Sequence, residues 1–473
     1  MPSYVAEGTL AGEGLTGTFR IVRDGVNERE DDVLGPRRET TLRVGDRISI
    51  RNANGNVREL RGYLRRRALT DELIASGAFV TQPQRTRFAG WGTVGTASAW
   101  RLEITAEGGE PETLWIDAST GLPLRLEFLD GDGPSYVDYS DWRDVEGRKI
   151  AFRNVLTDGD HRFDTVQQTT SVRVGAAVDA STFTMPPARV LAGDGVHSVP
   201  LIERDGHVGI TVRIANRDWF FLLDTGAQSI LVDTAVLRAA GVTGEGAMEV
   251  RGASRSGGLL TATLPEVAVD GVAMQDVVVS SLDLGRSLLG GTKIDGILGY
   301  PFFASAVVEM DFAHGVMRFG APGAFAPRGA HVALDVDREL AEASVRVNGR
   351  LDAPFIVDTG NSGEMLLYRP FLDAHPGLVP FSALPSWNYG IGGANATYHT
   401  SLDAVQLGGF DLYHRKVDVV LASQGAFADR VDAGNVGLGV LRNFVATFDI
   451  GNATMYLAPG PSFDDGRYRT ARR

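Results

Sequence analysis

The sequence predicts a mainly β fold, in which an antiparallel β-domain is followed by two copies of one β-unit. Two fully apolar strands, within residues 219–232 and 354–367, each end in the triplet Asp-Thr-Gly. Further features recur after each triplet in the same order, as a duplication produces. Ahead of them, short runs of alternating apolar and polar residues are separated by Asp-Gly, Asn-Gly and Gly-Gly turns, which favours antiparallel strands.

The antiparallel domain is predicted to occupy residues 1–190. Its clearest strands are 41–50, 99–106, 122–128 and 171–174, and one helical patch covers 67–78. Proline and glycine are frequent in residues 186–200, which predicts a boundary there.

The two repeated units are predicted at residues 198–322 and 330–460, with a second segment rich in proline and glycine, 321–329, between them. A short helix is expected in each unit, at 233–240 after a capping aspartate and at 368–375.

The repeated features lie at nearly constant offsets. Asp224 and Asp358 are 134 residues apart, and the glycine-rich stretches that begin near Gly252 and Gly390 are 138 apart. Ile297-Leu298-Gly299 is matched with Gly437-Leu438-Gly439 at an offset of 140. A lone Asp-Thr-Gly is ordinary turn chemistry, so the shared order of several features is what favours duplication.

Each triplet places a carboxylate at the end of a buried strand, where an acid is costly unless it is hydrogen-bonded or used. Two carboxylates a hydrogen bond apart hold one proton between them near neutral pH. The ionised member can take a proton from water while the protonated member donates to a carbonyl. Asp224 and Asp358 are therefore candidate catalytic residues for amide hydrolysis that needs no cofactor and no metal.

The threonine and the glycine of each triplet also fit a pair of facing carboxyl groups. Gly226 and Gly360 lack a Cβ where two backbones must approach, and their N–H groups are open to the carboxylates. Thr225 and Thr359 can hydrogen-bond across the two loops. The alternative interpretation is that both triplets are only structural turns.

These residues resemble those of the aspartic peptidases, with two retropepsin-like lobes fused in one chain as in pepsin, over about residues 200–460. The resemblance implies a bilobal, double-β-barrel fold in which the two triplets meet face to face and Asp224 and Asp358 form the catalytic dyad. In the family the crossed threonines lock the lobes together. The resemblance implies an aspartic endopeptidase that cleaves a peptide or protein substrate, and one chain completes the site, so a monomer suffices.

In that family a β-hairpin flap closes over the bound peptide. The candidate flap and substrate-contact residues are Gly252, Ala253, Ser254, Tyr389, Gly390, Ile391 and Gly392. An ordinary hairpin turn explains these glycines equally well.

Two departures from the family pattern stand out in the second unit. Its triplet continues with Asn361, whose amide can hydrogen-bond the outer oxygen of Asp358 and change how the proton is shared. Its apolar-apolar-glycine element has Gly437 in the first apolar place under the match made above.

Segments 114–125 and 179–186 of the first domain resemble lipoprotein-carrier-like half-barrels of bacterial envelopes. The resemblance implies a curved sheet that could hold a lipid, a peptide or the protease lobes, or could act as a scaffold. It also implies an exported bacterial protein, periplasmic or secreted after removal of a signal peptide, with a cytoplasmic location as the alternative. A second function therefore stays open, a non-catalytic envelope protein that binds peptide or lipid with a protease-like clamp.

The composition of the chain disfavours several other classes of function. The net charge of −13 disfavours a nucleic-acid partner, and no window approaches eighteen apolar residues, so no integral membrane segment is expected. The absence of cysteine excludes thiol proteases, and the eight histidines show no zinc-hydrolase spacing.

Overall fold

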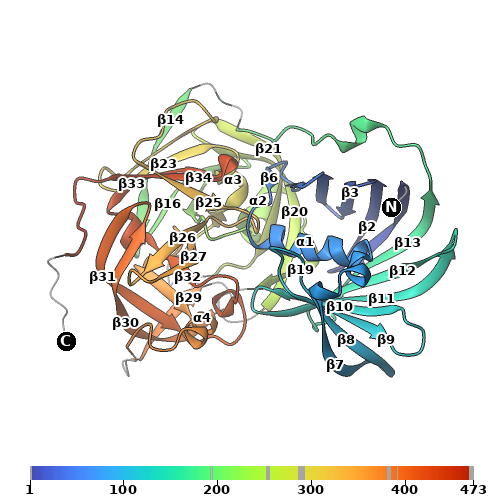
Figure 1. The fold of residues 1–473 in the computed structure, drawn as a ribbon. Coiled ribbons are helices and arrows are strands. Elements are labelled where there is room, and N and C mark those ends of the chain that lie inside the picture. Colours follow the sequence, from blue (N-terminus) through green and yellow to red (C-terminus); the bar gives the residue numbers. More distant parts are fainter. Residues whose placement is uncertain are drawn as a thin grey trace. The chain divides into compact units, whose positions relative to one another are not determined.

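The computed structural model describes residues 3–191, 193, 195–251, 256–285, 293–380, 385–390 and 393–467, without the side chains of 248–251, 256–258 and 389. The chain divides into two compact units (Figure 1). Unit 1 comprises Met1–Ala53, Val57–Pro187 and Glu245–Met248; unit 2 comprises Asn54–Asn56, Ala188–Gly244 and Glu249–Arg473. Strands dominate both units, so the prediction of a mainly β protein is confirmed.

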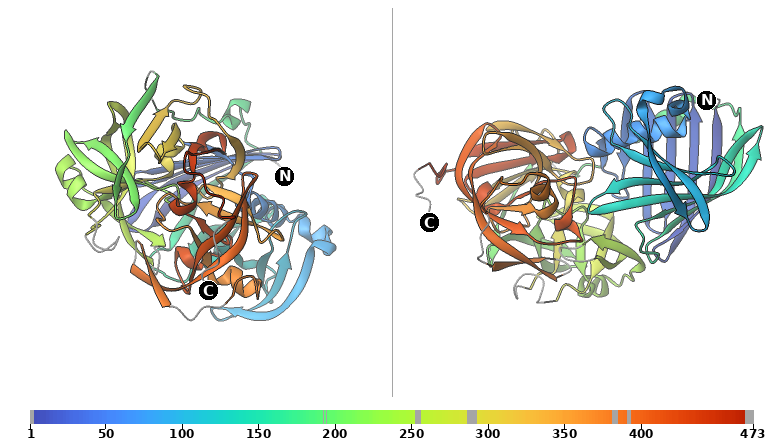
Figure 2. Two further views of the ribbon diagram at one scale, coloured as in Figure 1. Left: turned by 90° about the vertical axis from the view of Figure 1, so that its left-hand side faces the viewer. Right: turned by 60° about the horizontal axis from the view of Figure 1, so that its bottom comes forward.

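Unit 1 is one antiparallel sheet of 13 strands with the order β6-β5-β4-β3-β2-β1-β13-β12-β11-β10-β9-β8-β7. Figure 2 shows that this sheet curls along its length. Its elements are β1 (Tyr4–Gly12), β2 (Leu15–Asp24), β3 (Asn27–Leu34), β4 (Arg37–Val44), β5 (Arg47–Arg51), β6 (Val57–Glu59), α1 (Tyr63–Ala75), β7 (Thr86–Val94), β8 (Ala97–Ile104), β9 (Glu112–Asp117), β10 (Pro123–Asp130), β11 (Gly133–Val145), β12 (Arg148–Thr157) and β13 (Thr165–Val174).

Two details of unit 1 differ from the sequence prediction. The run 41–50 is not one strand but the β4–β5 hairpin, which turns at Gly45 with a φ of 58°. Helix α1 begins four residues before the predicted patch, because the buried Tyr63 anchors its first turn by donating a hydrogen bond to the carbonyl of Leu129 at 2.6 Å. That tertiary contact leaves no trace in the local pattern.

The elements of the first repeat lie in unit 2, except for Glu245–Met248, which group with unit 1. They are β14 (Val196–Pro200), β15 (Ile202–Arg204), β16 (His207–Ile214), β17 (Arg217–Leu223), β18 (Leu231–Asp233), α2 (Thr234–Ala240), β19 (Glu245–Arg251), β20 (Ser256–Val269), β21 (Val272–Leu282), β22 (Gly296–Leu298), α3 (Tyr300–Phe303), β23 (Val307–Asp311) and β24 (Val316–Gly320). The strand order β16-β17-β22-β18-β21-β20 closes on itself through β16–β20 pairing. We call this closed sheet the first barrel.

The second repeat has the same plan. Its elements are β25 (Ala330–Asp335), β26 (Glu342–Val347), β27 (Leu351–Val357), β28 (Met365–Tyr368), α4 (Arg369–Ala374), β29 (Pro385–Gly390), β30 (Gly393–Leu407), β31 (Phe410–Val420), β32 (Gly434–Val436), α5 (Leu438–Leu441), β33 (Phe444–Asp449) and β34 (Thr454–Pro459). The order β26-β27-β32-β28-β31-β30 closes through β26–β30 pairing. This closed sheet is the second barrel, orange to red in Figure 1.

The two repeats share parallel strand pairs at equivalent places. Strand β17 runs parallel to β22 and β18 to β21, as β27 runs parallel to β32 and β28 to β31. The repeats also share a sheet, in which β23 of the first pairs with β33 of the second and Glu309 lies opposite Thr447. One hydrophobic core runs through both barrels. The short helices α2 and α4 lie where the sequence predicted them, and Asp233 caps α2 through the N–H of Ala235.

Candidate active site

Each Asp-Thr-Gly triplet leaves the end of one strand and is fixed by the strand parallel to it. Asp224 follows β17, and its N–H donates to the carbonyl of Leu298 in β22 at 3.0 Å. Asp358 follows β27, and its N–H donates to the carbonyl of Val436 in β32 at 2.9 Å. The apolar residues that make these strands buried therefore also fix where the two carboxyl groups begin.

The two threonines cross between the triplets. The N–H of Thr225 donates to Oγ1 of Thr359 at 3.0 Å, and the N–H of Thr359 donates to Oγ1 of Thr225 at 3.1 Å. Each hydroxyl also donates to the strand of the other repeat: Thr359 to the carbonyl of Leu223 at 2.9 Å, and Thr225 to the carbonyl of Val357. Both threonines are 1% exposed, so four buried backbone groups depend on two hydroxyls.

Replacing Thr359 with valine is expected to lower the free energy of unfolding of unit 2 by about 2–6 kcal/mol. The valine fits the same space but leaves the N–H of Thr225 and the carbonyl of Leu223 buried without their partner, at a cost of about 1–3 kcal/mol each. Urea titration of Thr359→Val beside Thr359→Ser, which keeps the hydroxyl, measures the effect. An equal loss in the two variants would contradict the assigned role of the hydroxyl.

The carboxyl groups of Asp224 and Asp358 meet between the loops and share a hydrogen bond. The glycines make this approach possible. A Cβ on Gly360 would lie 2.5 Å from Cγ of Asp224, and a Cβ on Gly226 would lie 2.8 Å from Cγ of Asp358. Each glycine thus leaves room for the aspartate of the other repeat, and both aspartates keep partial exposure to solvent.

Gly360→Ala is expected to lower any activity of this pair by about 100-fold or more, because the added methyl displaces the Asp224 carboxyl from its partner and an error of ~1 Å in a reacting group costs about that much. Steady-state kinetics and circular dichroism of the variant measure the loss and the fold. Gly133→Ala is the matched control, since a Cβ there meets no atom within 4 Å. Full activity in Gly360→Ala would show that the close approach is not needed.

The two carboxyl groups accept different numbers of hydrogen bonds. Asp224 accepts from the N–H of Gly226 at 2.8 Å. Asp358 accepts at Oδ1 from the N–H groups of Gly360 at 2.9 Å and Asn361 at 3.1 Å, and at Oδ2 from the side-chain amide of Asn435 at 2.7 Å. Among the described residues, Asp358 therefore has three protein donors besides its partner, and Asp224 has one.

Burial raises the pKa of both carboxyl groups. The charge of Asp358 raises the pKa of Asp224 further, to well above its usual range. For Asp358 the hydrogen bonds from Asp224, Gly360 and Asn361 oppose the effect of burial on its pKa. Since donors favour the ionised form, the pair holds its proton on Asp224 and its negative charge on Asp358.

Asn435 is a site residue that the sequence analysis missed. The strand pairing places Ile297 opposite Leu222 and Asn435 opposite Ile356, so the equivalent residues are 138 apart and the match at 140 is wrong. Under the correct register Asn435, and not Gly437, stands in the first apolar place. The offset of 138 seen for the glycine-rich stretches was the signal that could have found it.

The predicted bond from the Asn361 side chain to Asp358 is also corrected. The amide of Asn361 donates to Oδ1 of Asn435 at 2.8 Å, and Asn435 in turn donates to Asp358. The backbone N–H of Asn361 is what reaches Asp358 directly.

One histidine supports the second triplet. Nδ1 of His207 lies 3.0 Å from the carbonyl of Gly360, and because a carbonyl only accepts, this nitrogen carries the hydrogen. Burial lowers the pKa of His207. The imidazole, which comes from β16 of the first repeat, therefore hydrogen-bonds the loop of the second triplet.

The predicted flap residues are only partly described. Gly390 ends β29 and lies opposite Gly393 of β30, and Tyr389 is described by its backbone alone. Gly252, Ala253, Ser254, Ile391 and Gly392 lie outside the described residues. Their contact with substrate stays a prediction.

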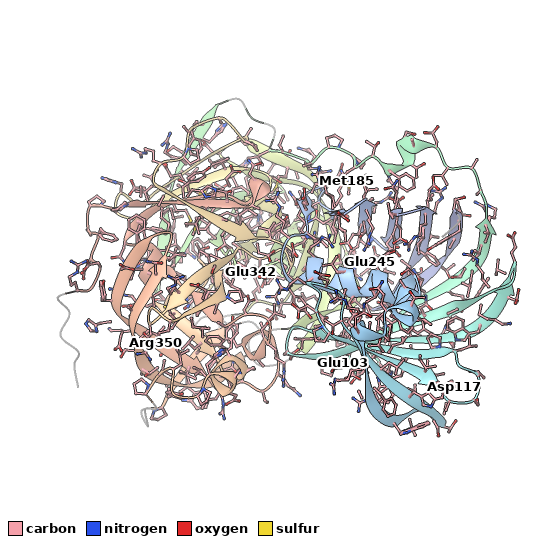
Figure 3. All side chains as sticks on the ribbon, in the orientation of Figure 1. Glu103, Asp117, Met185, Glu245, Glu342 and Arg350 are labelled. Carbon is pink, nitrogen blue, oxygen red and sulfur yellow. The ribbon has the colours of Figure 1, made fainter. Side chains whose placement is uncertain are left out.

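A buried charge cluster lies in the second barrel. Arg338 contacts Glu342, which is labelled in Figure 3, at 2.9 Å, Asp429 at 2.8 Å, and Asp432. Burial raises the pKa of Glu342 to about 7 and that of Asp432 well above its usual range. Asp432 thus belongs to an ion cluster of the second barrel.

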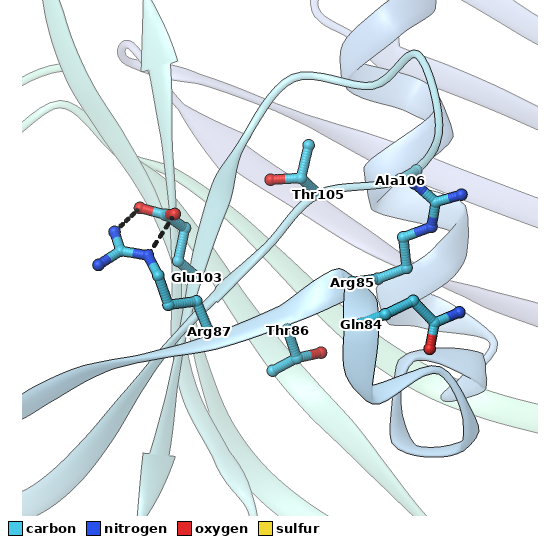
Figure 4. A pocket seen from close by; sticks show the side chains of 7 residues that line it. All are labelled: Gln84, Arg85, Thr86, Arg87, Glu103, Thr105 and Ala106. Atoms are coloured by element: carbon cyan, nitrogen blue, oxygen red, sulfur yellow. Dashed lines mark hydrogen bonds and ion pairs between the residues drawn. The ribbon is translucent and has the colours of Figure 1, made fainter.

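Unit 1 has a shallow hollow of about 260 Å³ lined by Gln84, Arg85, Thr86, Arg87, Glu103, Thr105 and Ala106 (Figure 4). Arg87 and Glu103 pair across it through two hydrogen bonds of 3.0 and 2.6 Å. Arg85 pairs with Glu107 at 2.6 Å, so each arginine that lines the hollow has an acidic partner. Within the described part of the chain, no group of three or more histidine or acidic side chains is placed to hold a metal ion, and no helix has the length and apolarity to cross a membrane.

A family model described as "Aspartyl protease" matches residues 210–302, which include the first triplet. No curated protein matches this chain. The chain therefore contains an aspartyl protease-like region, and the match ends before the second triplet.

Several solved structures are similar to parts of the chain. A retropepsin-like aspartic protease from Rickettsia conorii is 17% identical over 26% of this chain and 90% of its own, with a TM-score of 0.21. Basic 7S globulin from soybean is 13% identical over 56% of this chain and 96% of its own, with a TM-score of 0.33. A LolA superfamily protein from Nitrosomonas europaea is 16% identical over 38% of this chain and 88% of its own, with a TM-score of 0.27.

Proposed function

We propose that the protein is an aspartic endopeptidase whose catalytic residues are Asp224 and Asp358. The observation that carries this proposal is the partly buried pair of hydrogen-bonded carboxyl groups, one from each repeat, held by crossed threonines. A structural turn needs neither a second turn facing it nor a second acid whose charge raises the pKa of the first. In this proposal the two barrels are the lobes of a pepsin-like arrangement, and one chain supplies the whole site.

The reaction follows from where the proton lies. Asp358, ionised, takes a proton from a water whose oxygen attacks the peptide carbonyl carbon, while Asp224 gives its proton to the carbonyl oxygen. The resulting tetrahedral diol collapses when the amide nitrogen takes a proton from Asp358 and the C–N bond breaks. One hydroxyl of the diol returns a proton to Asp224, so the pair ends as it began.

The substrate is proposed to be an extended peptide or an unfolded protein segment, because strand addition between two barrels needs an extended chain. The residues proposed to touch it are those of the flap segments named above. An exported location, periplasmic or secreted, accompanies this proposal as an expectation from the family resemblance.

The test is incubation of the purified protein with an unfolded polypeptide from pH 3 to pH 8, with mass spectrometry of the products in H₂¹⁸O. The proposal predicts cleavage with a bell-shaped pH dependence, because the pair must hold one proton, and one ¹⁸O in each new carboxyl group. Absence of cleavage at every pH, with a peptide or lipid that co-purifies, would instead favour the non-catalytic clamp.

A further inference from the structure

The second repeat carries a polar residue where the first is apolar, directly beneath the carboxyl pair. Asn435 in β32 is 1% exposed and occupies the place that Ile297, 4% exposed, occupies in β22. A buried amide in a strand core is costly unless all its groups are paired. Asn435 is paired on both sides, with Asn361 and with Asp358.

One backbone N–H group fixes the direction of each hydrogen bond from Asn361 through Asn435 to Asp358. The N–H of Gly363 can only donate, and it donates to Oδ1 of Asn361 at 2.8 Å. The other end of Asn361 is therefore its NH₂ group, which donates to Oδ1 of Asn435. The NH₂ group of Asn435 is then the end that faces Oδ2 of Asp358, so Asn435 donates to that oxygen.

We propose that Asn435 is a positioning residue that assigns the two roles in the dyad. This inference rests on the proposed function: Asn435, aligned by Asn361, keeps Asp358 as the ionised base and leaves the proton on Asp224. We call the hydrogen-bond path from Asn361 through Asn435 to Asp358 the relay. The first repeat lacks both asparagines, because Ala227 stands where the second has Asn361 and Ile297 stands where it has Asn435.

The relay acts on one of the two ionisation steps of the pair. A donor to Oδ2 stabilises the form in which Asp358 is ionised over the form in which both acids are protonated, so it lowers the first apparent pKa. Asp358 is ionised before and after the second step, so the second apparent pKa does not depend on the relay. Asn435 thus extends the active range toward acid pH.

Other titratable groups surround the pair. Burial raises the pKa of Tyr368 in β28 well above its usual range, and the charge of Asp358 is among the further causes that raise it. His207 of β16 bonds the carbonyl of Gly360, and the cluster of Arg338 with Asp429, Asp432 and Glu342 lies in the same barrel. All of these remain in the variants below, so a difference between variants reports the relay alone.

The test compares Asn435→Leu with Ile297→Leu, which places the same side chain at the equivalent point of the first repeat. The measurement is the titration of the pair by ¹³C NMR of carboxyl-labelled aspartate, assigned with Asp358→Asn, together with the pH profile of kcat/KM. In Asn435→Leu the first midpoint and the acid limb are expected to rise by about one pH unit, which is the difference between a hydrogen bond to a charged and to a neutral acid. The second midpoint stays in place, and Ile297→Leu shifts neither.

Asn361→Ala is a second variant that leaves the core intact and gives the second loop the residue found in the first. It is expected to raise the first midpoint in the same direction by a smaller amount, because Asn435 keeps its amide but loses its alignment. First midpoints that overlay the wild type in both variants would overturn the proposal. Because the NMR titration needs no turnover, an inactive wild type would refute the peptidase and still test the relay.

Discussion

Asp224→Asn and Asp358→Asn are each expected to lower kcat/KM for an unfolded polypeptide by about 10⁴-fold, the upper range for losing a general acid or base. Asparagine keeps the shape of the carboxyl group, and its one oxygen can still accept from the backbone N–H groups of the loop, but it cannot exchange the proton. With Asp358→Asn the water has no base, and with Asp224→Asn the carbonyl oxygen has no acid. Initial rates under limiting substrate give kcat/KM directly.

The stability of these variants separates a chemical role from a structural one. Burial raises the pKa of both carboxyl groups. Asp358→Asn removes the charge of the pair, and Asp224→Asn replaces a protonated acid with another neutral group, so both variants are expected to keep the unfolding temperature or raise it. Asp218→Asn is the control. Asp218 lies in β17, the strand that leads to Asp224, and its exposed side chain pairs with Arg213. Wild-type activity in either dyad variant would refute the proposed chemistry.

Arg338→Met is expected to destabilise unit 2 by about 3–5 kcal/mol at neutral pH, the usual cost of removing one partner from a buried charge cluster. Arg338 is the single cation contacting Glu342, Asp429 and Asp432 among the described residues, and these side chains are 4%, 11% and 0% exposed. Methionine fills much of the same volume but leaves three acids without their counter-charge. Urea unfolding followed by hydrogen exchange in β26 and β28 isolates the effect on unit 2.

The pH dependence of this variant has a definite sign. A carboxyl group with a raised folded-state pKa is stabilising below its unfolded pKa and loses that contribution as pH rises through the folded value. For Glu342 this range runs from about 4.5 to about 7. Without Arg338 the acids must be protonated to stay buried, so the loss is expected to be smaller at pH 5 than at pH 8. Arg346→Met, which removes an exposed pair with Asp352, controls for general charge effects. A loss equal at both pH values would contradict the account.

Local sequence pattern sufficed for the parts of the site that repeat. The apolar strands before Asp224 and Asp358, and the glycines that follow, are short-range features whose burial and spacing are visible in each copy. Their meeting face to face followed only from the duplication and the family resemblance. The crossed threonine bonds join residues 134 apart, and only tertiary structure gives their direction.

Asn435 shows why the rest was harder to predict. Matching by glycines alone selected Gly437-Leu438-Gly439, because Gly437 and Gly439 are two residues apart and a slip of two keeps the side chains on the same face. Strand register resolves the ambiguity through pairing with β27. The role of Asn435 could not be predicted from the sequence, because it depends on the contact with Asp358, which lies 77 residues away along the chain.

In the proposed reaction the carboxyl groups of Asp224 and Asp358 act together on one water at a peptide carbonyl. The measurement that tests it most directly is a crystal structure with a peptide whose scissile carbonyl is replaced by a tetrahedral hydroxyl-bearing carbon, which mimics the diol. We expect the hydroxyl oxygen to lie within hydrogen-bond distance of both carboxyl groups, with the peptide extended between the barrels. An analogue bound elsewhere, or carboxyl groups too far apart to share that hydroxyl, would contradict it.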